Sequence, residues 1–353
     1  MSFSINPRVH LVVLFGGESA EHDVSCVTGA HVIAAADPNK YDISIIGIGR
    51  DGKWVLVEPT AEHIRTGRLQ ASGKATSLDA VIHLHPSARV VVLPLLHGPL
   101  GEDGTVQGQL ELANVAYVGS GVLSSAVCMD KTIAKEVLAF HGIAQPSFVS
   151  FRESALSEAD IDAMISELGL PVFVKPANMG SSVGVSKARS REEVVSALHE
   201  AFVYDEWAIC EEAIVGREIE VAVLGNSAPI ASVPGEIIPA GDFYDYEDKY
   251  INNAAQLLIP APLDTQLSDE VRNEAIKIFQ ALRCDGLARV DFFYEENGRG
   301  FLCNEVNTIP GFTPISMYPK LWEKSGVSYS ELIDRLVEFA TERHARRRRH
   351  TER

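Results

Sequence analysis

The sequence predicts an α/β protein whose N-terminal part is built on a parallel sheet. Residues 9–15 form a run that is apolar apart from His10, which is typical of a strand buried on both faces of such a sheet. Gly16 and Gly17 follow, and then a segment with apolar residues at helical spacing. Strand-like runs recur at 41–48 and 90–95, so strands and helices alternate as they do in α/β layers.

Length and composition bound the classes of protein to consider. The chain has 353 residues, of which 46% are hydrophobic and 22% charged, a globular balance in a chain long enough for two or three domains. Its net charge is −17, from 31 basic and 48 acidic residues, which argues against a nucleic-acid partner. The basic end, residues 344–353, is expected to be frayed and solvated.

Cysteine usage and hydropathy indicate an intracellular protein. The five cysteines are scattered without a C-x-x-C pair, so neither a disulfide framework nor a zinc site is predicted. The apolar run after Arg8 turns polar at Glu18, unlike a signal peptide, and no run approaches membrane-spanning length. We therefore expect a cytoplasmic location and no membrane partner.

The turn after the first strand resembles an anion-binding helix start. Ser19 is a candidate N-cap, and the helix that follows would offer its first N–H groups to an anion. The G-x-G-x-x-G spacing of dinucleotide sites is absent. Taken alone, Glu21 is interpreted as a first-turn acid that favours the helix dipole.

A second candidate ligand loop follows the strand at 90–95. Residues 96–108 contain four glycines at the carboxyl end of that strand, where open α/β sheets bind ligands. The loop carries His97, Glu102 and Asp103. A helix from Thr105 and a strand at 115–118 then complete the first domain.

The middle of the chain favours a nucleotide site. Asp130 is predicted to cap a helix that carries Lys131 and Lys135. A strand at 171–176 leads into residues 178–185, a Gly-Ser-Ser-x-Gly loop whose N–H and hydroxyl groups suit phosphates. The Gly-Lys-Ser/Thr of a P-loop is missing, but Lys175 just before the loop favours a nucleotide.

The segment beyond this loop contains an acidic strand and a long irregular stretch. A helix at 191–201 is followed by a strand at 207–211, which ends in Glu211. Glu211, the next residue Glu212, and Glu218 are either adenine and ribose contacts or a solvated acidic edge. Residues 239–253 are aromatic and aperiodic, which predicts an ordered lid. Helices at 268–282 and 328–342 complete the fold.

Residues 286–311 are predicted to form a hairpin with a polar face. Strands at 287–294 and 301–306 flank a turn rich in Asn and Gly. Arg289 and Asp291 share one face, as do Glu305 and Asn307, and an odd loop or a bulge would place both pairs on the same face. The resulting oxygen cluster suits Mg²⁺, while a solvated strand face is the alternative.

Five stretches carry a pattern that extends over almost the whole chain: HGPLGEDG (97–104), KPANMGSSVG (175–184), FYDYEDKY (243–250), RVDF (289–292) and NEVNTIPG (304–311). In this order and spacing they resemble the D-alanine–D-alanine ligases of the ATP-grasp superfamily. The opening GGESAEHDVS (16–25) also matches, with Glu18 at a position that varies, and only the basic tail falls outside.

The resemblance implies a fold and a division into domains. An N-terminal pre-ATP-grasp α/β domain (1–125) would precede a two-part ATP-grasp fold, with a central domain (126–212) and a C-terminal domain (213–345). The basic tail, 346–353, would be disordered. A homodimer is also expected.

The resemblance further implies an activity and the residues that perform it. Two D-alanines would be joined through an acyl phosphate, with ATP and two Mg²⁺ ions, or Mn²⁺ in their place. The implied roles are catalysis (Glu21, Ser181, Tyr250, Arg289, Gly311), substrate binding (His97, Lys249, Ser316), ATP binding (Lys131, Lys175, Ser182, Glu211, Glu218) and metal binding (Asp291, Glu305, Asn307).

Three other functions are considered beside this one. A ligase of the same fold could join D-alanine to D-lactate, although such enzymes depart from the Lys249-Tyr250 pair that is intact here. A phosphotransferase would stop at the phosphorylated carboxylate and would not need Lys249 and Ser316. A non-catalytic nucleotide-binding module would not need three metal ligands.

Overall fold

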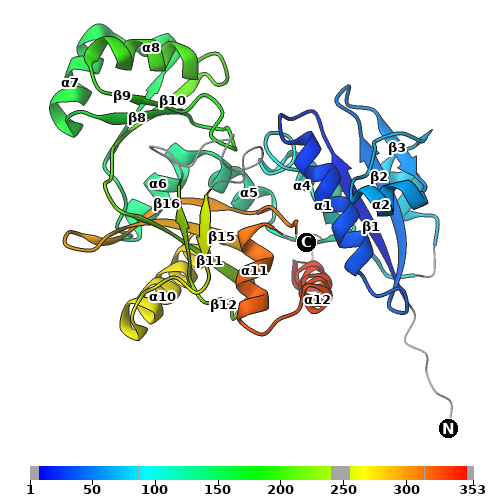
Figure 1. Ribbon diagram of the computed structural model, residues 1–353. Helices are drawn as coiled ribbons and strands as arrows, with labels where there is room; N and C mark the ends of the chain where they lie inside the picture. Colours follow the sequence, from blue (N-terminus) through cyan, green and yellow to red (C-terminus); the bar gives the residue numbers. More distant parts are fainter. Residues whose placement is uncertain (1–7, 86–87, 240–254, 314, 348–353) are drawn as a thin grey trace, which may run out of the picture.

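The computed structural model describes residues 8–85, 88–239, 255–313 and 315–347. Three β-sheets follow one another along this part of the chain, each with its own helices (Figure 1). The α/β fold class predicted from the sequence is confirmed.

The first sheet has six strands in the order β4-β3-β2-β1-β5-β6, and β2, β1, β5 and β6 are parallel. All eight residues of β1 are buried, as the apolar run predicts. The strands are β1 Val9–Gly16, β2 Tyr41–Ile48, β3 Trp54–Val57, β4 Lys74–Ala75, β5 Val90–Pro94 and β6 Ala116–Tyr117. The helices are α1 His22–Ala35, α2 Ala61–Thr66, α3 Leu78–Ile82, α4 Thr105–Leu112 and α5 Val122–Met129.

The start of α1 differs from the prediction. Its N-cap residue is Glu21, without a side-chain cap, so the assignment of Ser19 as N-cap is wrong. The Ser19 hydroxyl instead accepts from the N–H of Glu21 at 3.1 Å and donates to the carbonyl of His97 at 2.7 Å. Ser19 therefore ties the two ligand loops of the first sheet together.

The second sheet is antiparallel, in the order β7-β10-β8-β9, and has a hydrophobic core of its own. Asp130 is the N-cap of the helix that begins at Lys131, and its side chain accepts from the N–H of Ile133 at 3.0 Å, which confirms that prediction. The strands are β7 Phe148–Arg152, β8 Val172–Pro176, β9 Ser186–Ala188 and β10 Trp207–Glu212. The helices in this stretch of the chain are α6 Lys131–Phe140, the 3-10 turn η1 Glu153–Ala155, α7 Glu158–Leu168 and α8 Arg191–Ala201. Of these, α6 packs in the core of the third sheet, and α7 and α8 in that of the second.

The third sheet runs β14-β13-β11-β15-β16, with β12 paired to β11. Helix α10 spans Thr265–Ala281 and packs against β11 and β15. It begins three residues before the predicted Ser268 because Asp264 supplies the cap. The strands are β11 Arg217–Gly225, β12 Ile230–Ala231, β13 Gly235–Ile238, β14 Gln256–Leu258, β15 Gly286–Glu295 and β16 Gly300–Asn307.

The last two helices join the first and third sheets through one shared core. Helices α11 (Met317–Lys324) and α12 (Tyr329–Arg347) pack in a cluster that contains residues of β1, β5, β11 and β15. Figure 1 draws α12, in red, between the N-terminal sheet and the third sheet. The second sheet, in green, lies apart from this body and has its own core.

The basic end of the chain was predicted to be frayed from His344 onward, which is wrong as far as Arg347. Helix α12 continues to Arg347, and the guanidinium of Arg343 is buried over the ring of Tyr117 at 3.9 Å. Arg347 pairs with Glu111 at 2.7 Å. Acidic and aromatic partners on the first sheet thus stabilise the basic residues in a helix.

Among the residues that the structure describes, we find no helix with both the length and the apolar character needed to cross a lipid bilayer.

Candidate active site

A row of polar side chains lies on one face of the third sheet. A register shift between Asp291 and Phe292 leaves one extra residue on β16, so Asp291 lies opposite Glu305 and Arg289 opposite Asn307. Side chains opposite each other on paired strands share a face. The sequence predicts a shared face for these side chains if the hairpin contains a bulge. The bulge is present, and all four side chains lie on one face.

Arg289 and Asp291 form a bidentate ion pair within this row. The Arg289 Nε and Nη2 atoms lie 2.7 Å from the two oxygens of Asp291, and the amide of Asn307 donates to the same carboxylate at 3.0 Å. Burial lowers the pKa of Arg289, but the charges of Asp291 and Glu220 raise it by more, so that the net pKa is well above its usual value. Arg289 is therefore a permanent cation among carboxylates.

Glu220 belongs to this face and was missed by sequence reasoning. It lies opposite Asp291 on β11, and its Oε2 atom is 3.1 Å from the Arg289 Nε atom. Its signal in the sequence is its position two residues after Glu218, which places both on one face of a strand. Without knowledge that β11 pairs with β15, nothing connected it to the hairpin.

Lysines of strand β8 and helix α6 face this row. Lys175, on β8, donates to the Oε2 atom of Glu211 on β10 at 2.5 Å, and Lys135 reaches the other oxygen from α6 at 3.0 Å. Lys131, at the start of α6, donates to the carbonyl of Met179 at 2.6 Å and lies 4.0 Å from Glu305. Lys135 was noted in the sequence as part of this helix but was given no role.

Glu211 is the anion that holds these lysines together. Burial raises its pKa, but Lys135 and Lys175 lower it by more, to about 2. Burial likewise lowers the pKa of Lys175, and Glu211 raises it above its usual value. The cluster therefore remains charged on both sides at neutral pH.

The glycine-rich loop between β8 and β9 has an unusual backbone. Ser181 and Ser182 both have positive φ, 50° and 60°, a region that residues other than glycine seldom adopt. Two successive left-handed residues orient neighbouring N–H groups in a way that suits an anion. Such strain is concentrated at ligand-binding sites.

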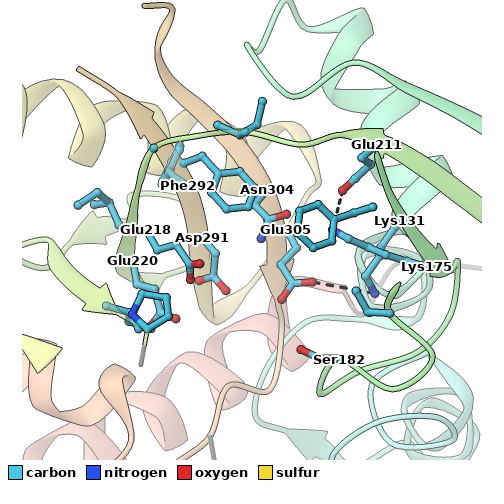
Figure 2. Close-up of a pocket in the computed structure, with 18 of the residues that line it drawn as sticks. Lys131, Lys175, Ser182, Glu211, Glu218, Glu220, Asp291, Phe292, Asn304 and Glu305 are labelled. Carbon is cyan, nitrogen blue, oxygen red and sulfur yellow. Dashed lines mark hydrogen bonds and ion pairs between the residues drawn. The ribbon is translucent and has the colours of Figure 1, made fainter. Parts of the chain in front are cut away.

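Most of these groups line one cavity of about 520 Å³ between the second and third sheets, whereas Lys135 and Asn307 are not among its described lining residues. Figure 2 shows Glu218, Glu220 and Asp291 on one side, Lys131 and Lys175 on the other, and Glu305 between them. The predicted site residues that line it are Lys131, Lys175, Ser181, Ser182, Glu211, Glu218, Arg289, Asp291 and Glu305. Asn304, the bulge residue that sequence reasoning gave no role, also lines it, and its Oδ1 atom is buried without a hydrogen-bond partner in the part of the chain that the structure describes.

A second cluster adjoins the glycine-rich loop where the first sheet meets it. The Ser181 hydroxyl donates to the buried carboxylate of Glu21. His97 is buried beside Glu102, and its ring donates to the carbonyl of Ile309 at 3.0 Å. Because Ile309 follows β16 by two residues, this contact connects the cluster to the end of the carboxylate row.

Burial and the neighbouring acids shift the pKa values of His97 and Glu102 in the second cluster. Burial lowers the pKa of His97, whereas Glu102 and Glu21 raise it, and the net shift is upward. Burial and the neighbouring Glu21 also raise the pKa of the Glu102 carboxyl. A ligand's ammonium group would therefore be accepted by the carboxylate of Glu21, on the side away from His97, because a protonated imidazole repels a second cation.

Two glycines leave the room that the Glu21 carboxylate occupies. A Cβ atom added at Gly180 would lie 2.9 Å from the Glu21 Oε2 atom, and one added at Gly98 would lie 3.1 Å from it. The two predicted ligand loops therefore converge on Glu21 from both sides.

Gly311 and Ser316 lie together beyond β16. A Cβ atom at Gly311 would be 2.9 Å from the Ser316 hydroxyl, which also accepts from the N–H of Thr313 at 3.1 Å. The remaining two predicted residues, Lys249 and Tyr250, and the predicted lid at 239–253 apart from Pro239, lie outside the described residues.

The donor set on the sheet face is compatible with a hard divalent cation. Within the described ranges, no three His, Cys, Asp or Glu side chains form a metal-binding group. A cation here would therefore use the carboxylates of Asp291 and Glu305, the amide oxygen of Asn307, and oxygens from a substrate, which is how Mg²⁺ is usually held beside phosphates. We call Lys131 and Lys175 the lysine wall, and Asp291 and Glu305 the carboxylate row. Cations that face carboxylates across one cavity suit a phosphorylated ligand with such a divalent cation.

Comparison with known proteins agrees with this geometry. The family described as "D-ala D-ala ligase C-terminus" matches residues 137–338, and "D-ala D-ala ligase N-terminus" matches residues 10–120. A D-alanine–D-alanine ligase of Halothermothrix orenii is 48% identical, covering 95% of this chain and 99% of its own. That of Oceanobacillus iheyensis is 45% identical over 95% of both.

Solved structures show the same arrangement. The D-alanine–D-alanine ligase from Coxiella burnetii superposes with a TM-score of 0.83 at 37% identity, over 96% of both chains. The VanG D-Ala:D-Ser ligase from Enterococcus faecalis gives 0.82 at 34% identity, over 94% of this chain and 99% of that one. A D-alanine–D-alanine ligase from Bacillus anthracis complexed with ATP gives 0.74 at 31% identity, over 96% and 99%. The three-sheet arrangement is therefore the ATP-grasp fold of these enzymes, as predicted.

Proposed function

The chain belongs to the D-alanine–D-alanine ligase family, and on that premise we propose that it joins two molecules of D-alanine at the expense of ATP. The product, D-alanyl-D-alanine, is a precursor for peptidoglycan. One observation carries the proposal. The lysine wall, the carboxylate row and the Glu21 cluster adjoin one another, so a phosphate donor and an amino acid can lie side by side.

ATP is assigned to the cavity between the second and third sheets. Lys131, Lys175 and Ser182 would contact its phosphates, and Glu211 and Glu218 would lie near the adenine and ribose. Asp291, Glu305 and Asn307 would hold Mg²⁺, or Mn²⁺ in its place. The cation would neutralise the charge of the phosphates when bound.

The first chemical step needs a carboxylate held next to the γ-phosphate. Glu21, oriented by Ser181, would bind the ammonium of the first D-alanine, with His97 bordering it. A carboxylate oxygen of that D-alanine then bonds to the γ-phosphorus while the bond to the β-phosphate oxygen breaks. The products of this step are ADP and a D-alanyl phosphate.

The second step uses the amine of the second D-alanine. The deprotonated amine attacks the carbonyl carbon of the acyl phosphate, and the phosphate leaves with the oxygen that joined it to carbon. The nitrogen gives up a proton as the amide forms, and the departing phosphate can accept it. Arg289 and the N–H of Gly311 would stabilise the tetrahedral oxyanion. Lys249 and Ser316 would hold the carboxylate of the second D-alanine, and Tyr250 would link the lid to Ser181.

D-Alanine is favoured over other acceptors by the relatives. Those at 43–48% identity are named D-alanine–D-alanine ligases, whereas the D-Ala:D-Ser ligase is 34% identical. The sequence also retains Lys249 and Tyr250, which argues against D-lactate.

An acceptor competition tests this assignment. The protein is mixed with ATP, Mg²⁺, labelled D-alanine and equal concentrations of unlabelled D-alanine, D-serine and D-lactate, and the products are identified by mass. D-Alanyl-D-alanine should dominate at neutral pH. A main product with D-serine or D-lactate would refute the acceptor assignment, and the absence of any coupled product would refute the ligase.

Three further proposals concern the whole protein. We assign domains to 1–125, 126–212 and 213–345, and a cytoplasmic location, where peptidoglycan precursors are made. We also propose a homodimer, for which Phe140, an exposed apolar side chain at the end of α6, is a candidate contact. Sedimentation of the wild type and of Phe140→Ser would test it, because loss of the dimer is expected in the variant.

A further inference from the structure

Arg289 has two anionic partners within reach of one guanidinium. Both Asp291 oxygens lie 2.7 Å from its Nε and Nη2 atoms, and the Glu220 Oε2 atom lies 3.1 Å from Nε. All three side chains are largely buried, with exposures of 18% for Arg289, 12% for Asp291 and 6% for Glu220. Water therefore screens these charges poorly.

The bidentate pair conflicts with the role proposed for Asp291. A cation bound by Asp291 needs oxygens that now accept from Arg289, and it brings a second positive charge close to the guanidinium. A buried guanidinium that loses its only counter-ion is strongly destabilising. Asp291 can therefore take a cation at low cost only if Arg289 keeps another anion.

Glu220 meets this requirement without any strand movement. Glu220 is on β11, directly opposite Asp291 on β15. Glu305 lies opposite Asp291 on the other neighbouring strand, β16. A small rotation of the guanidinium towards Glu220 would free the Asp291 oxygens for the cation between β15 and β16. Arg289 would remain on the face where the proposed oxyanion forms.

We infer that Glu220 is a positioning residue, which keeps Arg289 ion-paired in the site while Asp291 binds the divalent cation that accompanies the nucleotide. The inference rests on the proposed function, which brings cation and nucleotide to this face. It assigns a role to a carboxylate outside the predicted site residues.

The test measures cation binding directly. Mn²⁺ binding is followed by electron paramagnetic resonance in the presence of a non-hydrolysable ATP analogue, so no turnover is needed. Among the described residues, Glu220→Gln leaves Asp291 as the carboxylate that pairs directly with Arg289. Mn²⁺ should then bind about tenfold more weakly, within the range of couplings in ion-pair networks.

Glu236→Gln is the matched control. Glu236 is as buried as Glu220 and lines the same cavity, but it is bound to Arg217 through two bonds of 2.8 Å. The same charge is removed without touching Arg289, so Mn²⁺ binding should stay within about twofold of the wild type. An equal loss in both variants would overturn the inference.

A double-variant cycle separates the role of Arg289 from simple attraction between Glu220 and the cation. In an Arg289→Met background there is no guanidinium to hold, so adding Glu220→Gln should not weaken Mn²⁺ binding further. If Glu220 acted only by its charge, the loss would persist or grow, which would overturn the inference.

The remaining outcomes are also decisive. Wild-type affinity in Glu220→Gln would overturn the inference and leave the proposed function standing. Failure of the wild type to bind Mn²⁺ with the nucleotide analogue would overturn the cation part of the proposed function, and this inference with it. If Glu220→Gln does not fold, Glu220→Asp keeps the charge with a shorter reach and should bind a few-fold more weakly; wild-type affinity there would overturn the inference.

Discussion

Replacing Glu211 by Gln should destabilise the protein strongly, although the shape of the side chain is kept. The change leaves the ammonium groups of Lys135 and Lys175 buried without their shared carboxylate. The pKa of Glu211 is about 2 against a usual 4.5, which corresponds to about 3 kcal/mol of stability at neutral pH. Removing one partner of a buried ion pair costs roughly 3–5 kcal/mol, so both estimates agree.

The pH dependence of this loss has a definite sign. Because the pKa of Glu211 is lowered by folding, its contribution is fully present above the usual carboxyl value of 4.5 and is lost as the pH falls through about 2. The difference in free energy of unfolding between the wild type and Glu211→Gln should therefore be constant from pH 7 to pH 5. It should fall to about half by pH 3.

The assay is urea denaturation followed by circular dichroism at several pH values without nucleotide. Hydrogen exchange of the β10 peptide (207–212) reports locally on the stability of the second sheet. Glu212→Gln is the matched control: the adjacent carboxylate is partly exposed and pairs with Arg299, so its loss should cost less than about 1 kcal/mol. A Glu211→Gln effect no larger than that of the control, or one independent of pH down to pH 3, would refute the reasoning.

Two other variants test the packing around the site. Gly180→Ala places a Cβ atom 2.9 Å from the Glu21 carboxylate, so the KM for the first D-alanine should rise about tenfold in steady-state kinetics while the KM for ATP stays nearly constant. Gly108→Ala is the control, because its Cβ atom meets no described atom within 4 Å. Equal effects in both variants would contradict the placement of Glu21. Arg343→Met should lower the free energy of unfolding by about 2 kcal/mol in chemical denaturation, because it removes the contact with Tyr117 that joins α12 to the first sheet. Arg335→Met, on the exposed face of the same helix, should change it by less than about 0.5 kcal/mol, and similar losses in both would argue against the role of Arg343.

Local patterns in the sequence predicted most of the elements that build the site. The apolar run of β1, the cap at Asp130 and the two strands of the hairpin follow from short-range chemistry and are confirmed. Alternation along the hairpin also predicted the shared face, but only on condition of an odd loop or a bulge. The condition could not be resolved from the sequence because the extra residue, Asn304, has no distinctive composition.

Long-range pairing explains what the sequence did not provide. Glu220 is 69 residues before Arg289 in the chain, and only the pairing of β11 with β15 brings them together. The C-terminal arginines were interpreted as a solvated end because their acidic and aromatic partners, Glu111 and Tyr117, lie more than 200 residues earlier. Ser19 failed as a helix cap for the same reason, since its hydroxyl is used by the loop at His97.

The fate of a single oxygen atom tests the proposed ligation most directly. D-Alanine labelled with ¹⁸O in its carboxylate is incubated with ATP, Mg²⁺ and the protein, and the inorganic phosphate is analysed by mass. Because the carboxylate oxygen that attacks the γ-phosphorus leaves with the phosphate, each D-alanyl-D-alanine formed should yield one phosphate containing ¹⁸O. Unlabelled phosphate alongside dipeptide would contradict an acyl-phosphate pathway at this site.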